Sequence, residues 1–362
     1  MNLTEETVTV QKFDASFYIL MIVKLFVSIW DFVTYPIYQA IYKPWEKRKY
    51  YLKPKSKCLS QYTTSSQMVF EANEKDGAYY REFVSSNPKT MVDAWKWAVQ
   101  RNRSKPALGT REILKEEDEV QKNGKIFKKY DLGEYRWLTY EDADYTSDYI
   151  GRGLRRTGLE HGEKVCIFAD TRAEWLLTAH ACFKQGFPIV TLYTNLGEEA
   201  VIHGVNETEV THIITSHELL PKFRSILPNT PKVTHVIYME HQVERTETKG
   251  YPDNVQILAF YEVLHTGKKL VNSSEVDPIP PKETDAAIVM YTSGSTGVPK
   301  GVIMSQRNML STARGLMQSF DLIPNKNDTY LCFLPLAHVL ELLSEHMWCL
   351  YGVKLGYSSP NT

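Results

Sequence analysis

The longest run of apolar positions in this 362-residue chain lies near its N-terminus. Residues 15–42 contain only two charged side chains, Lys24 and Asp31. A helix of about 20 mostly apolar residues can cross a bilayer. Polar side chains nevertheless recur at helical spacing in this run, at Lys24, Ser28, Asp31, Tyr35 and Gln39. The pattern predicts a membrane helix that crosses the bilayer or lies in its interface with a polar stripe facing water, crossing being favoured. A buried core helix is the alternative.

The pattern changes from residue 138 onward, where short apolar runs alternate with amphipathic segments. The short runs predict strands over 164–169, 187–192, 211–215 and 233–239. The segments between them predict helices over 139–157, 173–185, 198–206 and 219–225. This alternation is typical of crossover units, so the fold class is α/β with mostly parallel sheets and flanking helices. Residues 111–130 are polar and predict an exposed loop or hairpin, and residues 250–284 predict a connector.

Charge modifies this picture at one place. Lys+Arg is 42 and Asp+Glu is 43, so the net charge of −1 gives no reason to expect nucleic acid as a partner. Residues 43–57, however, carry seven positive charges and one negative charge. Basic residues beside a membrane segment stay cytosolic and attract anionic headgroups. Residues 1–14 are therefore predicted to be lumenal. The five cysteines are scattered, which argues against a disulfide framework and a structural zinc site.

The segment most suggestive of chemistry begins after the connector. Residues 286–291 predict a strand, residues 302–304 a second strand, and Ser305 can cap the helix that follows. Between the strands, residues 292–301 read TSGSTGVPKG. Glycines let backbone N–H groups turn inward, and hydroxyls and a lysine complete a surface for phosphate. The spacing is not that of a Walker A loop. A generic serine–glycine turn is the alternative.

The run YTSGSTGVPKGV, from residue 291, resembles the phosphate-binding signature of the adenylate-forming (AMP-binding) superfamily. Residues 333–341, FLPLAHVLE, resemble a second motif of that family, which holds a histidine near the acyl site. The strings WLTYED at 137–142, FPIVTLYTNLG at 187–197 and LGYSSP at 355–360 are similar to long-chain fatty-acid–CoA ligases in particular. The resemblance covers residues 17–362.

This resemblance implies a two-step reaction that uses ATP with Mg²⁺, and CoA as co-substrate. A long-chain fatty acid attacks the α-phosphate of ATP and forms an acyl-adenylate, from which the CoA thiol displaces AMP. His338 is then the catalytic candidate, although a lone histidine in an apolar run is otherwise a core residue. The β- and γ-phosphates would be held by Thr292, Ser293, Gly294, Ser295, Thr296, Gly297 and Lys300. Glu341 is expected to be structural, Glu345 and His346 are expected on a helix face, and no metal ligand is assigned.

Family members are about twice as long as this chain. Residues 58–362 are therefore expected to form an incomplete large domain, and the chain alone is expected to be inactive. One alternative is a non-catalytic, membrane-bound interaction fragment. Another is a different adenylate former, such as a very-long-chain acyl-CoA synthetase. The catalytic part is expected in the cytosol. The membrane is expected to be the endoplasmic reticulum, with lipid droplets, the mitochondrial outer membrane and peroxisomes as alternatives.

Overall fold

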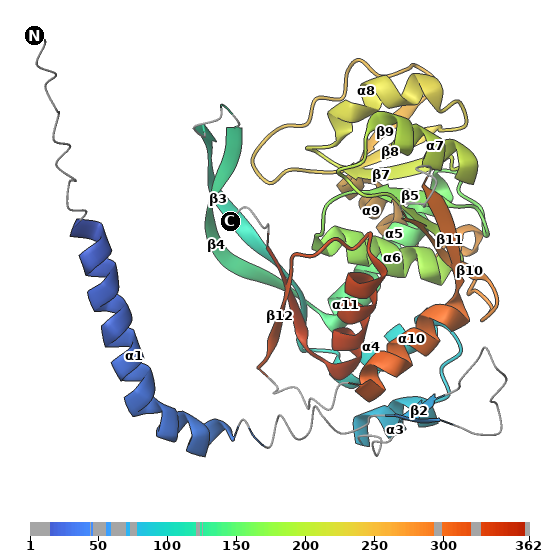
Figure 1. Cartoon of the computed structure of the whole chain (residues 1–362). Helices are drawn as coiled ribbons and strands as arrows, with labels where there is room; N and C mark the ends of the chain where they lie inside the picture. Colours follow the sequence, from blue (N-terminus) through green and yellow to red (C-terminus); the bar gives the residue numbers. More distant parts are fainter. Residues whose placement is uncertain are drawn as a thin grey trace, which may run out of the picture. The chain divides into compact units, whose positions relative to one another are not determined.

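The computed structural model describes residues 15–43, 45, 56–58, 70–72, 78–120, 124, 126–292, 299–319 and 327–358. The chain divides into two units, Met1–Lys75 and Asp76–Thr362. The described elements of the first unit are helix α1 (Ala15–Tyr42) and strands β1 (Ser56–Cys58) and β2 (Phe70–Ala72), which pair antiparallel (Figure 1).

Helix α1 has the bounds predicted from the apolar run. Several of its large side chains are exposed, and Phe32 is 82% exposed. No helix within the described residues is both long enough and apolar enough to cross a membrane. The predicted crossing is therefore not confirmed. Lys24 and Asp31 lie within the run, and charged side chains are costly inside a bilayer.

A seven-stranded sheet forms the centre of the second unit, with the strand order β11-β10-β6-β5-β7-β8-β9. Its strands are β5 (Val165–Phe168), β6 (Ile189–Thr191), β7 (His212–Ser216), β8 (His235–Met239), β9 (Gln256–Ala259), β10 (Ala286–Thr292) and β11 (Lys300–Ser305). All neighbouring strands are parallel except β10 and β11. The predicted mostly parallel α/β sheet is confirmed.

Two groups of helices cover the two faces of this sheet, so that successive residues of a strand enter different cores. In β5, Val165 and Ile167 pack in one core, whereas Cys166 and Phe168 pack in the other. The first core includes residues of α5 (Tyr140–Arg156), α6 (Ala173–Gln185) and α9 (Phe260–Lys269). The second includes residues of α7 (Glu198–Thr208) and the one-turn helix α8 (Phe223–Ile226) (Figure 1).

The local signals for helix ends are largely confirmed. Thr139 and Asp142 form the predicted capping box before α5, and Gly186 ends α6 in a left-handed conformation. The helix predicted over 219–225 is instead a single α-turn between two 3₁₀ turns, Leu220–Lys222 and Leu227–Asn229, each with a proline in its first turn. Proline lacks a backbone N–H and its ring clashes with the carbonyl four residues earlier, so the α-turn does not continue through the proline of Leu227–Asn229.

The connector predicted over 250–284 is wrong in part, because this segment contains β9 and α9. Helix α9 packs against α5 through a close backbone approach at Gly267. A Cβ atom at this position would lie 1.8 Å from the carbonyl oxygen of Tyr149. Tertiary packing of this kind leaves little trace in local periodicity.

A second, four-stranded sheet has the order β12-β13-β3-β4. Its strands are β3 (Pro106–Val120), β4 (Ile126–Thr139), β12 (Thr329–Cys332) and β13 (Lys354–Tyr357). Four helices accompany it, namely α3 (Ala78–Ser85), α4 (Met91–Asn102), α10 (Gln306–Ser319) and α11 (Val339–Tyr351). The predicted hairpin over 111–130 is confirmed as the outer part of β3 and β4, which pair antiparallel.

Candidate functional site

A cleft of about 700 Å³ lies along the carboxyl edge of the seven-stranded sheet. Its lining residues 169–172, 193–195 and 240–242 follow strands β5, β6 and β8, and residues 216 and 218 lie at and just after the end of β7. The carboxyl ends of parallel strands are where ligands bind in open α/β sheets. The β3–β4 hairpin and residues of the 333–341 segment supply the remaining walls.

Two threonines at this edge hold the 333–341 segment in place. Thr171, just after β5, donates a hydrogen bond from Oγ1 to the carbonyl of Leu334 and accepts one from the Leu336 amide at 3.0 Å. Thr191, the last residue of β6, donates from Oγ1 to the carbonyl of Ala337 at 3.4 Å. The ends of two central strands therefore position the segment, and Phe333, Pro335 and Ala337 line the cleft.

His338 lies at the N-cap of α11 and is exposed, not buried in the core. Its Nδ1 accepts a hydrogen bond from the Leu340 amide at 3.2 Å. A neutral ring that accepts at Nδ1 carries its proton on Nε2. The outer ring nitrogen of His338 is therefore a hydrogen-bond donor, suited to a carboxylate or phosphate oxygen.

The described ends of the predicted phosphate loop are paired with each other. Thr292 ends β10, Lys300 begins β11, and the two residues are Cα partners in the antiparallel ladder. Oγ1 of Thr292 donates to the carbonyl of Lys300 at 3.5 Å, and both residues are exposed. Because β10 is parallel to β6, Thr292 lies at the edge of the sheet that lines the cleft. The other predicted loop residues, Ser293, Gly294, Ser295, Thr296 and Gly297, lie outside the described residues.

The two halves of the predicted site are carried by different elements. Within the described part of the chain, no hydrogen bond or ion pair joins His338 to Thr292 or Lys300. What they share is a sheet edge, since the 333–341 segment is bonded to the end of β6 and the loop leaves the neighbouring strand β10.

Several charged cleft residues were missed in the sequence. Arg172 donates two hydrogen bonds to Glu174, at 2.9 and 3.0 Å, and a third to the carbonyl of Glu240 at 3.3 Å. Burial would raise the pKa of Glu174, but the charge and hydrogen bonds of Arg172 outweigh it and leave that pKa below its ordinary value. Asp170 accepts a hydrogen bond from Thr194 at 2.7 Å. A rule that marks residues directly after each predicted parallel strand would have found them.

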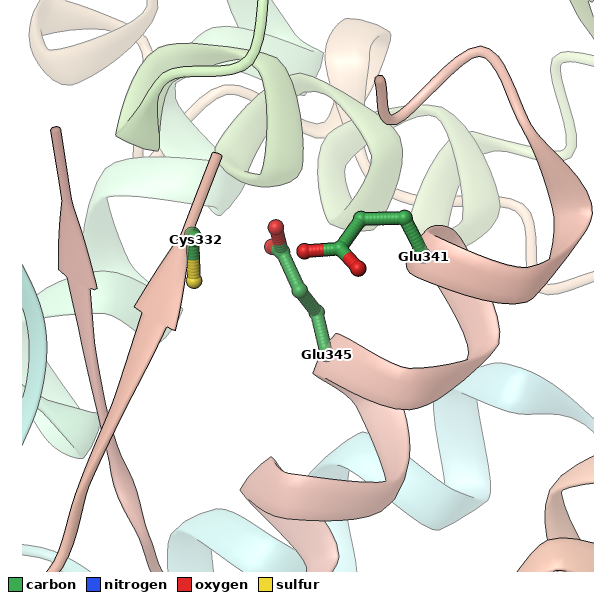
Figure 2. A group of neighbouring side chains, drawn as sticks. All are labelled: Cys332, Glu341 and Glu345. Atoms are coloured by element: carbon green, nitrogen blue, oxygen red, sulfur yellow. The ribbon is translucent and has the colours of Figure 1, made fainter. Parts of the chain in front are cut away.

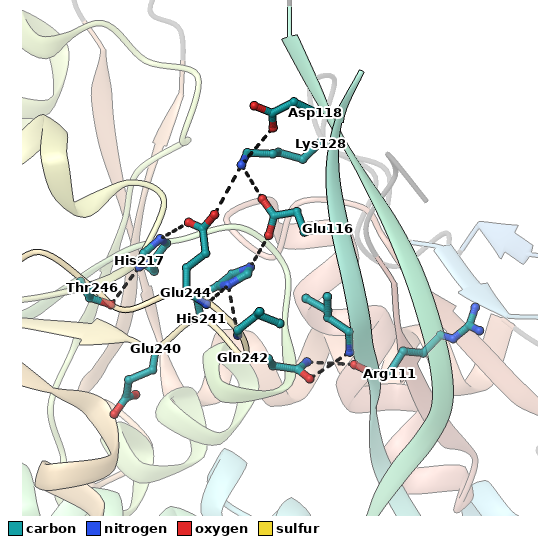
Figure 3. Close-up of polar contacts among 12 residues, drawn as sticks. Arg111, Glu116, Asp118, Lys128, His217, Glu240, His241, Gln242, Glu244 and Thr246 are labelled. Atoms are coloured by element: carbon teal, nitrogen blue, oxygen red, sulfur yellow. Dashed lines mark hydrogen bonds and ion pairs between the residues drawn. The ribbon is translucent and has the colours of Figure 1, made fainter. Parts of the chain in front are cut away.

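Polar contacts tie the β3–β4 hairpin to the segment after β8 (Figure 3). Gln242 accepts a hydrogen bond from the Ile113 amide at 3.1 Å and donates one to the Arg111 carbonyl at 2.9 Å. Lys128 of the hairpin forms ion pairs with Glu116 and, at 3.5 Å, with Glu244. These contacts fix the outer wall of the cleft relative to the sheet.

Helix α11 is fixed to the second sheet by two buried carboxyl groups. Glu341 and Glu345 are 1% and 0% exposed. Tyr330 of β12 donates a hydrogen bond to Glu341 at 2.8 Å, and Tyr357 of β13 donates one to Glu345 at 2.7 Å. Burial raises the pKa of Glu345 to about 8. As expected, Glu345 lies on a helix face with His346, and this face is buried.

Comparison with known proteins places the chain among enzymes that form adenylates. The AMP-binding enzyme family model matches residues 114–362. Long chain acyl-CoA synthetase 8 of Arabidopsis thaliana is 36% identical over 276 residues, which are 75% of this chain and 38% of that protein. Long-chain-fatty-acid–CoA ligase 1 of Schizosaccharomyces pombe is 32% identical over 321 residues, 82% of this chain and 46% of the relative. The chain thus spans less than half the length of these two relatives.

Solved structures show the same fold at lower identity. The adenylation domain of a carboxylate reductase from Mycobacterium chelonae superposes with a TM-score of 0.62 at 17% identity, covering 83% of this chain and 51% of that one. A putative long-chain-fatty-acid CoA ligase from Rhodopseudomonas palustris gives 0.56 at 16% identity, covering 75% and 57%. These likenesses show the fold. The family match covers more than half of the 362 residues, and the chain therefore belongs to the AMP-binding enzyme family.

Proposed function

We propose that this chain takes part in the activation of long-chain fatty acids. A fatty carboxylate attacks the α-phosphate of ATP and releases diphosphate, and the thiol of CoA then displaces AMP from the acyl-adenylate. One observation carries the proposal: the 333–341 segment is bonded to the end of β6, and Thr292 ends the neighbouring parallel strand β10, so both lie at the carboxyl edge of one sheet. The names of the relatives supply the substrate class.

Both steps concentrate negative charge on oxygen, so fixed donors and cations are what the chain must supply. Lys300 and Thr292 serve the phosphates of ATP in this proposal, and Nε2 of His338 donates to the carboxylate or the adenylate. Mg²⁺ would enter with ATP and would neutralise part of the charge on its phosphates. The exposed hydroxyl of Thr292 is an oxygen ligand of the kind that Mg²⁺ accepts. Apolar cleft residues such as Phe333 and Leu132 face the acyl chain.

Because the chain spans less than half of its two relatives, ligand binding is the first measurement. ATP binding by the full chain should weaken by at least tenfold in Lys300→Ala. It should be unchanged in Lys232→Ala, whose lysine is exposed and pairs with Glu209 away from the loop. The second measurement is exchange of labelled diphosphate into ATP with palmitate, a very-long-chain acid, acetate or benzoate. Equal ATP binding by both variants, or exchange that prefers acetate or benzoate, would refute the proposal. A preference for the very-long-chain acid would favour the alternative of a very-long-chain acyl-CoA synthetase.

We propose in addition that α1 lies in a membrane interface, that of the endoplasmic reticulum. The support is the exposure of large apolar side chains such as Phe26 (68%) and Phe32 (82%), and the basic segment 43–57. Burying one such ring contributes about 1.5–3 kcal/mol. Sedimentation with vesicles containing phosphatidylserine should therefore weaken more than tenfold in the Phe26→Ser/Phe32→Ser variant. Val243→Ser, which also alters an exposed apolar residue, is the control. Equal binding by both variants would argue against the proposal.

A further inference from the structure

A buried group of three acidic side chains lies between β12 and α11. Cys332 ends β12, and Glu341 and Glu345 lie four residues apart on α11, so both carboxyl groups face the strand (Figure 2). The sulfur and one oxygen of each carboxyl group all lie within 4.8 Å of one another. All three residues are buried, and Cys332 and Glu345 are 0% exposed. None of them has a role in the function proposed above.

The carboxyl groups are oriented so that one oxygen of each is left without a partner. The hydroxyls of Tyr330 and Tyr357 donate to Oε2 of Glu341 and Glu345 respectively. Oε1 of each glutamate is buried and has no hydrogen-bond partner. Among the described residues, no lysine or arginine forms an ion pair with either carboxylate. Buried polar atoms without partners are costly, and hydrogen bonds that hold a ligand's other oxygen are typical of metal sites.

We propose that Cys332, Glu341 and Glu345 bind a divalent cation of the zinc class. Zinc accepts one thiolate and two carboxylate oxygens, with Zn–S of about 2.3 Å and Zn–O of about 2.0–2.2 Å. These bonds place tetrahedral ligand atoms about 3.5 Å apart, so small side-chain rotations bring the three atoms onto one ion. Magnesium demands an octahedral set of oxygen atoms, which this set does not supply.

The cation also explains how three acidic groups share one buried space. A thiol and two carboxyl groups each carry an acidic proton, and a metal ion binds only their deprotonated forms. Zinc replaces those protons, which pass to solvent, and zinc affinity must therefore rise with pH. The other titratable groups that face the site are Tyr330, Tyr357 and Cys349. A bound ion would lock α11, which begins beside His338, onto the second sheet.

The test is zinc binding by the full chain. After treatment with a chelator and dialysis against Zn²⁺, we expect one zinc per chain by elemental analysis. Further dialysis against Mg²⁺ should not displace that zinc. Cys332→Ser, Glu341→Gln and Glu345→Gln should each weaken zinc binding by more than tenfold. Cys182→Ser and Glu207→Gln are matched controls, since Cys182 is buried in α6 and Glu207 accepts a hydrogen bond from a tyrosine elsewhere. Equal zinc content in the chain and its Cys332→Ser variant would overturn the proposal.

A second measurement keeps the proposal testable if the ligand variants do not fold. Cobalt bound in place of zinc should give a thiolate-to-metal absorption band in the unaltered chain, and the absence of that band would overturn the proposal. Tyr357→Phe keeps all three ligands but removes the hydroxyl that orients Glu345, so zinc affinity should fall about tenfold. An unchanged affinity in this variant would contradict the orienting role on which the proposed geometry depends.

Discussion

Replacing Glu345 with glutamine should remove a large pH dependence from the stability of the chain. The carboxyl group is fully buried, and burial raises its pKa from 4.5 to about 8 in the folded state. In the unfolded chain water surrounds the group, and its pKa returns to the ordinary value. Between these two pH values the folded chain holds a proton that the unfolded chain has lost. The contribution of Glu345 to the unfolding free energy is therefore fully present below pH 4.5 and is lost as the pH rises towards 8.

The size of the effect follows from the gap between the two pKa values. Where the folded chain binds one proton more than the unfolded chain, the unfolding free energy changes by about 1.4 kcal/mol per pH unit. The difference between the folded and unfolded pKa values of Glu345 therefore corresponds to about 5 kcal/mol. Between pH 5 and pH 8 the unaltered chain should lose roughly 3 to 4 kcal/mol of unfolding free energy because of Glu345. Glutamine keeps an oxygen that can accept the hydrogen bond from Tyr357 but cannot ionise, so Glu345→Gln should lack this loss.

Urea denaturation at pH 5, 6, 7 and 8 measures this difference, with a chelator present to exclude divalent cations. Contributions of groups that do not interact with Glu345 are shared by both proteins and cancel in the comparison. Glu341 is coupled to Glu345, because its charge also raises the pKa of that group. Glu207→Gln, which replaces a half-exposed carboxylate, controls for the substitution itself. A difference in unfolding free energy between Glu345→Gln and the unaltered chain that stays constant from pH 5 to pH 8 would refute the reasoning.

Three further substitutions and one control test how helices and the walls of the cleft are held. Gly267→Ala should destabilise the chain by about 3 kcal/mol or more, because its Cβ would meet a carbonyl oxygen of α5 at 1.8 Å. Gly315→Ala is the control, because a Cβ there meets open space; its stability should be equal to that of the unaltered chain or up to about 1 kcal/mol higher. Equal melting temperatures of the Gly267→Ala and Gly315→Ala variants would contradict the proposed close packing at Gly267. Thr171→Val removes two hydrogen bonds to the 333–341 segment and should cost about 1–3 kcal/mol in urea denaturation, whereas an unchanged midpoint would exclude that anchoring role. Gln242→Ala should speed hydrogen exchange at the Ile113 amide, and unaltered protection there would show that the hairpin is held by other contacts.

Strands and capped helices could be predicted because their signals are local. The capping box at Thr139 and the glycine stop at Gly186 depend on side chains within three residues, and both appear where the sequence puts them. Helix α9 was missed for the opposite reason. Its seat on α5 depends on Gly267, a residue that periodicity treats as a helix breaker and that only the distant helix explains.

The candidate site was partly predictable on the same principle. The loop from Thr292 to Lys300 and the segment around His338 are contiguous motifs, so the sequence alone could single them out. Arg172 and Glu174 belong to no motif. Their importance follows from the order of strands in the sheet, because strand order decides which loops share an edge.

The group of Cys332, Glu341 and Glu345 shows where sequence reasoning has to stop. The spacing of four residues between the glutamates predicts that they share a helix face, but it does not say what that face meets. Strand β12 pairs with β13, and β13 pairs with β3, so the second sheet brings Cys332 and two tyrosine hydroxyls to the same face. The same sheet extends as the β3–β4 hairpin into the wall of the cleft. The second sheet thus borders both sites, and an ion bound as proposed would fix α11, whose N-cap is His338, to that sheet.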